Sequence, residues 1–107
     1  MSRFMDRMKE RVLILDGGMG TALMEYDLDL ENDFLGLENC SEILCDSRPD
    51  VVKDIHRSFF EAGSDAVETN TFGSNKVVLE EFGLTERTRE LNRIAVEQAR
   101  QVAEEFS

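Results

Sequence analysis

Residues 13–21 read Leu13-Ile14-Leu15-Asp16-Gly17-Gly18-Met19-Gly20-Thr21, and this stretch decides the predicted fold. The unbroken apolar run over 12–15 is typical of a strand that is buried on both faces, as in a parallel sheet. The run ends at an aspartate and glycines, which allow a ligand to approach the backbone closely. Because α/β folds bind ligands at the carboxyl ends of their strands, we expect this stretch to form half of a binding site.

A second strand is expected at Ala66-Val67-Glu68-Thr69, shortly after a helix. That helix begins at Pro49, whose ring suits the first helical turn, and it ends at Ala62, before Gly63. In a right-handed crossover both strands end at the same edge of the sheet. Apolar residues at helical spacing predict further helices over 3–10, 21–26, 74–82 and 85–106, the first of them lying across the end of the sheet. This order of elements predicts the α/β class.

The length and charge of the chain limit its function. At 107 residues it forms one domain at most, and two strands are too few for a parallel sheet, so we predict the amino-terminal piece of a larger domain. Its 23 acidic and 12 basic residues give a net charge of −11, which repels nucleic acids and anionic membranes. No apolar run approaches the roughly 20 residues that span a bilayer, and the charged first residues lack a signal-peptide core. We therefore expect a cytoplasmic protein without nucleic-acid or membrane partners.

Polar groups follow both predicted strands and suggest a site for an amino acid. Acceptor oxygens that suit a ligand ammonium are carried by Asp16, Glu68, Thr69 and Asn70. Backbone N–H groups that suit a ligand carboxylate are those of Gly17, Gly18 and Met19. Two other interpretations stay open. Aspartate before glycine is also common turn chemistry. The glycines resemble a phosphate cradle, although Leu23 stands where the dinucleotide motif has its third glycine and no P-loop lysine is present.

Other residues are weaker candidates for metal binding or catalysis. Acidic residues at the spacing of a calcium loop are Asp27, Asp29, Glu31, Asp33 and Glu38, but Asn32 stands where that loop needs glycine, so we interpret the segment as a solvated acidic loop. Cys40 and Cys45 are expected to be reduced thiols that pack, because a C-x4-C pair alone is a poor zinc site. His56 is expected to pack or to lie at the surface. No self-sufficient catalytic set is present.

Five stretches, taken in order, resemble one enzyme family. They are 11–21, Cys40-Ser41-Glu42-Ile43-Leu44, Arg48-Pro49-Asp50-Val51-Val52, 56–63 and Glu68-Thr69-Asn70-Thr71-Phe72-Gly73. Together they are similar to the homocysteine S-methyltransferase family, in the form of the homocysteine-binding barrel of the cobalamin-dependent methionine synthases. The resemblance implies a (β/α)8 (TIM) barrel that is incomplete in this chain, of which residues 1–107 form the first two β/α units.

The resemblance also implies an activity and roles for individual residues. A methyl group passes to the zinc-activated thiolate of homocysteine and forms methionine. By the same resemblance Asp16 and Thr69 hold the substrate ammonium, and the backbone at Gly17 and Gly18 holds the carboxylate. Asn70 is a neighbour of this site.

One departure limits what the resemblance implies for this chain. The family's zinc cysteines lie on later strands, and Cys40 and Cys45 do not match them. We therefore expect zinc and methylcobalamin to serve the complete enzyme, and the isolated chain to hold neither and to be inactive. The expected partners are homocysteine, the remainder of the barrel, and downstream folate and cobalamin modules. Two alternatives remain: a cobalamin-independent homocysteine methyltransferase that uses another methyl donor, and a non-catalytic, self-associating α/β module.

Overall fold

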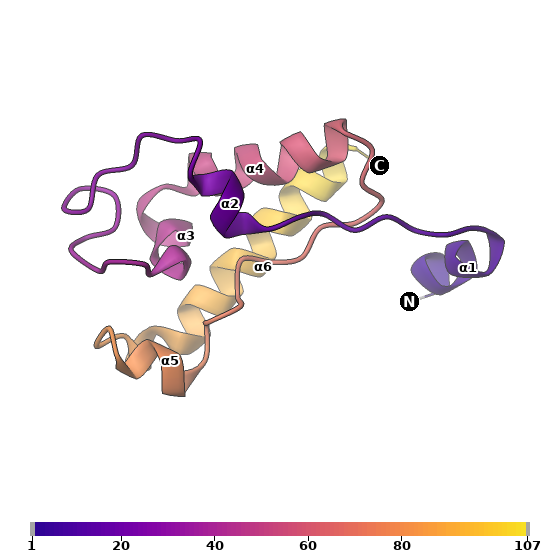
Figure 1. Cartoon of the computed structure of the whole chain (residues 1–107). Helices are drawn as coiled ribbons and strands as arrows, with labels where there is room; N and C mark the ends of the chain where they lie inside the picture. The colour runs from indigo at the N-terminus through magenta and orange to yellow at the C-terminus, as the bar shows by residue number, and fades with distance from the viewer. Residues whose placement is uncertain (1, 107) are drawn as a thin grey trace.

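The computed structural model describes residues 2–106, which form helices joined by turns and extended segments (Figure 1). The α-helices in this range are α1 (Ser2–Glu10), α2 (Met19–Leu23), α3 (Leu44–Ser47), α4 (Pro49–Glu61), α5 (Lys76–Glu80) and α6 (Thr88–Glu105). Two short 3₁₀ helices, η1 (Ser41–Ile43) and η2 (Thr85–Arg87), precede α3 and α6. No helix within residues 2–106 is long and apolar enough to cross a membrane.

The predicted fold class, α/β with the first two units of a (β/α)8 barrel, is wrong for the residues that the structure describes. They contain no strand and no sheet. The two segments that were expected to be strands meet only in one isolated parallel bridge, between Leu15 and Ala66. The apolar run is exposed instead of buried, with 85% of Val12 and 58% of Ile14 accessible. An apolar run indicates that its side chains are stabilised by burial. A strand forms only where neighbouring strands pair with the run through hydrogen bonds.

Helix α4 confirms the strongest local prediction. It begins at Pro49 and ends at Glu61, one residue before the predicted end. Gly63 follows with φ of +111°, a left-handed conformation that a residue with a β-carbon rarely adopts. The buried residues of the helix are Val51, Val52, Ile55 and His56. The proline, the glycine and the apolar spacing are therefore sufficient to define this helix.

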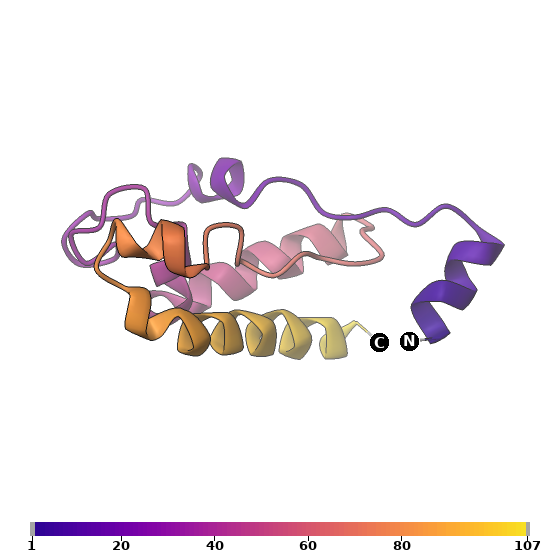
Figure 2. The same cartoon turned by 90° about the horizontal axis from the view of Figure 1, so that it is seen from below.

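Helix α6 packs along α4, and the pair lies on one side of the extended segments (Figure 2). The apolar spacing predicts its buried face correctly from Leu91 to Val102, which includes Ala95 and Ala99, whereas Phe106 lies past the end of the helix and is exposed. At one end of the pair the rings of Phe60 and Phe106 stack with centroids 5.2 Å apart. Arg57 reinforces this end by donating a hydrogen bond of 2.8 Å to Glu105. The two helices form the base on which the site is built.

Two apolar clusters make up the core. One gathers buried side chains of α2, α3, α4 and α6, with Phe59 packed against it. The other joins Leu79 of α5 and Leu91 of α6 to Cys40 and Ile43. The clusters hold α3 and the following helices together, so the compact part of the chain begins at α2.

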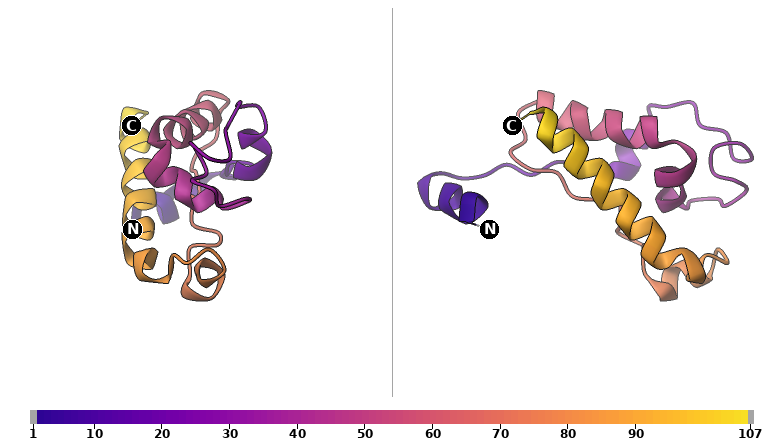
Figure 3. Two further views of the ribbon diagram at one scale, coloured as in Figure 1. Left: turned by 90° about the vertical axis from the view of Figure 1, so that its left-hand side faces the viewer. Right: turned by 180° about the vertical axis from the view of Figure 1, so that it is seen from behind.

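Helix α1 forms as predicted but does not cover the rest of the molecule. It lies apart from the other helices, at the end of the extended segment that precedes α2 (Figures 1 and 3). Its apolar residues Phe4, Met5 and Met8 are about half exposed. The expectation that this helix lies across the end of a sheet is therefore wrong, since no sheet is present among residues 2–106.

The remaining helices differ from their predicted bounds for local reasons. The helix expected over 21–26 begins earlier and is α2 (Met19–Leu23). The helix expected over 74–82 shortens to α5, because Asn75 caps it by accepting a hydrogen bond of 3.0 Å from the Val78 backbone N–H. The helix expected over 85–106 opens as a 3₁₀ turn, η2, before α6.

Candidate functional site

The two segments that carry most of the predicted site lie side by side and run in the same direction. Asp16 Oδ1 accepts a hydrogen bond of 3.1 Å from the Glu68 backbone N–H, one step beyond the parallel bridge. On the other side of the bridge, Ile14 O accepts from the Asp65 backbone N–H at 2.7 Å, and the Asp65 carboxylate accepts from the Ile14 N–H at 2.8 Å. The Asp65 carboxylate also pairs with Arg11 at 2.6 Å. The segments are therefore joined through polar side chains.

The glycines after Asp16 leave backbone donors open. Gly17 and Gly18 are exposed, and neither backbone N–H donates a hydrogen bond within residues 2–106. Gly17 rests on the ring of Phe59, so closely that a β-carbon added at Gly17 would lie 3.1 Å from ring atom Cε1. A larger residue at Gly17 would therefore require the Phe59 ring or this segment to shift. The arrangement provides a fixed carboxylate and free N–H donors on neighbouring residues.

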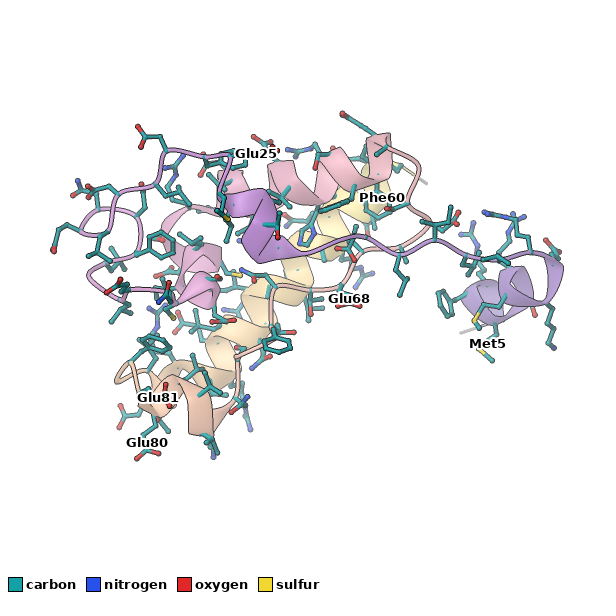
Figure 4. All side chains as sticks on the ribbon, viewed as in Figure 1. Met5, Glu25, Phe60, Glu68, Glu80 and Glu81 are labelled. Atoms are coloured by element: carbon teal, nitrogen blue, oxygen red, sulfur yellow. The ribbon has the colours of Figure 1, made fainter. Side chains whose placement is uncertain are left out.

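The Glu68 side chain is exposed, on the segment next to Asp16 (Figure 4). Thr69 is oriented differently: its hydroxyl lies 2.7 Å from the Thr71 hydroxyl. Thr69 also lines a cleft of about 800 Å³ that α1, α4 and α6 surround, and it is the only predicted site residue to do so. The structure therefore joins Asp16 to the backbone of Glu68, whereas the Thr69 hydroxyl pairs with that of Thr71.

Asn70 is buried and turned toward η1 and α3. Its Nδ2 donates to the Ser41 backbone carbonyl at 3.0 Å and lies 3.4 Å from Cys45 Sγ. Gln98 of α6 reaches the same place and donates to the Cys45 carbonyl at 2.7 Å. The Asn70 amide nitrogen is thus bonded within the protein, and it anchors the loop that follows Thr69.

Glu42 is a second anchor of that loop, and sequence reasoning did not identify it as one. Its side chain is buried, and Oε2 accepts a hydrogen bond of 3.0 Å from the Gly73 backbone N–H. A β-carbon at Gly73 would lie 3.2 Å from the same oxygen and 3.1 Å from Val78. A side chain at Gly73 would therefore require the carboxylate or Val78 of α5 to shift. No local signal marks this contact, because 31 residues separate its partners.

Both cysteines are free, buried thiols, and they do not fit the zinc centre that the family resemblance implies. Burial raises the pKa of Cys45 to about 11 and also raises the pKa of Cys40, so burial disfavours the thiolate form that zinc requires. Within residues 2–106 no group of three histidine, cysteine or acidic side chains converges on a point that could hold a metal ion. Cys40 and Cys45 therefore do not form a zinc site in this structure.

The acidic loop uses its carboxylates for its own backbone. Asp29 accepts from the Asn32 N–H and Asp33 accepts from the Asp29 N–H, both at 2.7 Å. Asp33 also pairs with Arg48 at 2.9 Å, and these bonds lower the pKa of Asp33. Leu28 and Phe34 anchor the loop on the core, whereas Leu30 is exposed. The loop is stabilised by turns and one ion pair.

His56 is buried on the inner face of α4. It is fully buried, and neither ring nitrogen has a hydrogen-bond partner within residues 2–106. Burial lowers the pKa of His56, and the charge of Asp16 opposes this shift in part. An unpartnered buried polar group destabilises a fold by roughly 1–3 kcal/mol. Packing alone therefore does not account for a histidine at this position.

Comparison with known proteins places these features in context. Residues 13–107 match the sequence model of the family described as homocysteine S-methyltransferase. The chain is 50% identical over 102 residues to a methionine synthase of Mycobacterium tuberculosis, and this match covers 95% of the chain. It is 46% identical over 103 residues to a methionine synthase of Mycobacterium leprae, over 96% of the chain. Each match spans 8% of the relative's length.

Proposed function

The chain belongs to the homocysteine S-methyltransferase family, and on that premise we propose that it supplies amino-acid recognition to an enzyme that methylates homocysteine to methionine. In this proposal residues 1–107 are the amino-terminal part of a homocysteine-binding domain in a longer, cytoplasmic enzyme, and the isolated chain is inactive. Homocysteine is the substrate. The zinc and methylcobalamin implied by the family resemblance serve the complete enzyme, outside this chain, together with its folate and cobalamin modules.

One observation carries the proposal: a carboxylate and two unbonded backbone N–H groups occur on consecutive residues of the segment that leads into α2. The Asp16 carboxylate suits an ammonium, and the N–H groups of Gly17 and Gly18 suit a carboxylate. An amino acid is the small zwitterion that requires both. Glu68 is a second carboxylate on the neighbouring segment.

Thr69 and Asn70 have less direct roles in this proposal. Thr69 contributes its hydroxyl to the substrate ammonium, as the family resemblance implies, after separating from Thr71. Asn70 acts by holding the loop after Thr69 on Ser41 and Cys45. A substitution of Asn70 therefore affects recognition through the position of the loop.

Substitution of Asp16 in the full-length enzyme tests the proposed function. A charge-assisted hydrogen bond contributes roughly 1.5–3 kcal/mol, so Asp16→Ala should raise the homocysteine KM about 10- to 100-fold. Asp16→Asn should give a similar loss while keeping an acceptor for the Glu68 N–H. Asp27→Asn, at an exposed carboxylate of the acidic loop, is the matched control and should leave KM unchanged. An unchanged KM in both Asp16 variants would remove Asp16 from the site.

The methyl donor is tested separately. Methionine formation by the full-length enzyme that requires methylcobalamin supports the first proposal. Methionine formation with another methyl donor and without cobalamin supports a cobalamin-independent homocysteine methyltransferase. Both alternatives predict the same effect of Asp16→Asn on the homocysteine KM. The assay therefore separates the two enzymes without changing the role given to Asp16.

Exposure of apolar residues on the extended segment favours a second, non-catalytic function for the chain, self-association. Val12, Ile14 and Leu15 are all exposed, and neither Val12 nor Leu13 forms a backbone hydrogen bond within residues 2–106. An exposed segment with such unpaired backbone groups is a template for pairing. Size-exclusion chromatography with hydrogen exchange on the 107-residue chain tests this function. A dimer with protected amides at residues 12–15 supports it, and a monomer with rapid exchange there excludes it.

A further inference from the structure

His56 lies beneath the 16–18 segment, which carries the proposed amino-acid site. It is on α4, three residues before Phe59, so both side chains lie on the same face of the helix. The ring of Phe59 contacts Gly17, the residue next to Asp16. In agreement with this geometry, the charge of Asp16 partly opposes the lowering of the His56 pKa by burial. The fully buried histidine is therefore under the 16–18 segment and not at a remote part of the core.

The buried imidazole has hydrogen-bonding capacity that the protein leaves unused. A neutral imidazole carries one N–H donor and one acceptor nitrogen, and neither nitrogen of His56 is bonded within residues 2–106. Asp16 uses one carboxylate oxygen for the Glu68 N–H, and a carboxylate accepts about four hydrogen bonds. Asp16 therefore has room for both a ligand ammonium and a second donor from the protein.

We propose that His56 is a positioning residue for Asp16: when an amino acid binds, the imidazole N–H donates a hydrogen bond to the Asp16 carboxylate and holds it toward the ligand ammonium. This inference rests on the proposed function. The Glu68 N–H and the imidazole N–H together fix the carboxylate from two directions. An apolar side chain at position 56 would fill the same space and would not fix the carboxylate.

His56→Leu, His56→Asn and His56→Gln in the full-length enzyme test the proposal, with homocysteine KM, kcat and thermal unfolding measured on each variant. His56→Leu should raise KM roughly tenfold, the effect of one hydrogen bond to a charged group, with kcat changed less and the unfolding temperature not lowered. Either His56→Asn or His56→Gln should restore KM, depending on which ring nitrogen donates. A purely structural role would instead lower the unfolding temperature and leave KM unchanged, and that result would overturn the proposal.

Two further measurements keep the outcomes distinct. If KM rises in Asp16→Asn but not in His56→Leu, the role of His56 fails while the proposed function stands; if KM is unchanged in both, the proposed function itself fails. The imidazole ¹⁵N signals of His56, assigned by their loss in His56→Gln, provide a readout even where His56→Leu does not fold. The ¹⁵N chemical shift of one ring nitrogen should change when homocysteine is added. Unchanged chemical shifts at saturating homocysteine would overturn the proposal.

Discussion

The carboxylate of Asp16 accepts a hydrogen bond from the backbone N–H of Glu68 at 3.1 Å, so a residue proposed to bind substrate also joins the two extended segments. The two roles need different properties of the side chain. Joining the segments requires an acceptor oxygen, whereas binding an ammonium requires a negative charge. Asparagine keeps the first and loses the second, and alanine loses both.

We therefore expect the two substitutions of Asp16 to separate stability from recognition. Asp16→Ala should destabilise the chain by about 1 kcal/mol, the typical contribution of one hydrogen bond, and should speed hydrogen exchange at the Glu68 amide. Asp16→Asn should leave both quantities close to those of the unsubstituted chain. Urea unfolding and amide exchange measure the difference. Equal loss of stability in the two variants would mean that the charge, and not the acceptor, joins the segments.

Gly73 and Gly20 form a matched pair for testing the loop anchor. Gly73→Ala should destabilise the chain, because its β-carbon would lie 3.1 Å from Val78 and 3.2 Å from the Glu42 carboxylate that holds this loop. Gly20→Ala should be neutral or stabilise by about 0.5–1 kcal/mol, because no atom lies within 4 Å of a β-carbon there and Gly20 is in α2. Urea unfolding of both variants gives the comparison. Equal stability of the two would show that the loop moves without penalty.

The buried histidine predicts how stability depends on pH. Burial places the pKa of His56 below its ordinary value of 6.5, so the unfolded chain takes up this proton first as pH falls. His56 should therefore not reduce the free energy of unfolding above pH 6.5. As pH falls from 6.5 toward the pKa of His56 in the folded chain, the free energy of unfolding should decline. His56→Gln should remove this decline. Ion pairs and hydrogen bonds hold the pKa values of Asp33, Asp50 and Asp65 below 3.8. These carboxylates therefore change the free energy of unfolding only at lower pH.

Denaturant unfolding of the unsubstituted chain and of His56→Gln, at several pH values between 6.5 and 4.5, checks this prediction. The lower limit is the ordinary pKa of glutamate, and Asp33, Asp50 and Asp65 remain ionised there. The histidine chain should lose stability over this range relative to the glutamine variant. A constant difference between them would mean that His56 is not shielded from solvent in the folded chain.

The parts of the fold that sequence predicted are those with local causes. Pro49, Gly63 and a regular apolar stripe define α4, and the spacing from Leu91 to Val102 defines the buried face of α6. The apolar run that starts at Val12 has no such local cause. It was interpreted as a buried strand because burial and strand formation share one pattern, and the exposure of Val12 depends on which partner segments are present.

The same division applies to the candidate site. Two predicted strand ends at one edge correctly placed Asp16 near Glu68, although a sheet did not form around them. The actual contacts of Asn70 and Glu42 could not be predicted, because their partners are distant in sequence. For a buried polar residue, the sequence gives the hydrogen-bonding groups of the side chain. The tertiary fold determines which groups they bond to.

The exposed end of the bridged segments provides a further test. Asp65 pairs with Arg11 and also accepts from the Ile14 backbone N–H, so the two partners of this ion pair are not equivalent. Asp65→Ala should speed hydrogen exchange at Ile14 and loosen the extended segment, whereas Arg11→Met should leave the Ile14 hydrogen bond in place. Amide exchange at low and high salt measures both. Equal acceleration in the two variants would mean that the ion pair, and not the backbone bond, holds the segment.

The thiols offer the last prediction. Burial raises the pKa of Cys45 to about 11 from an ordinary value of 9.0, and it also raises the pKa of Cys40. The thiolate is the reactive form, so at pH 8 both cysteines of the folded chain should react slowly with a thiol-specific reagent and quickly once denaturant unfolds the chain. Asp27→Cys places a thiol at an exposed position of the acidic loop and is the matched control, expected to react at once. If Cys45 is modified as fast as that control, α3 does not shield it, and the contact that anchors Asn70 on its sulfur is not maintained in solution.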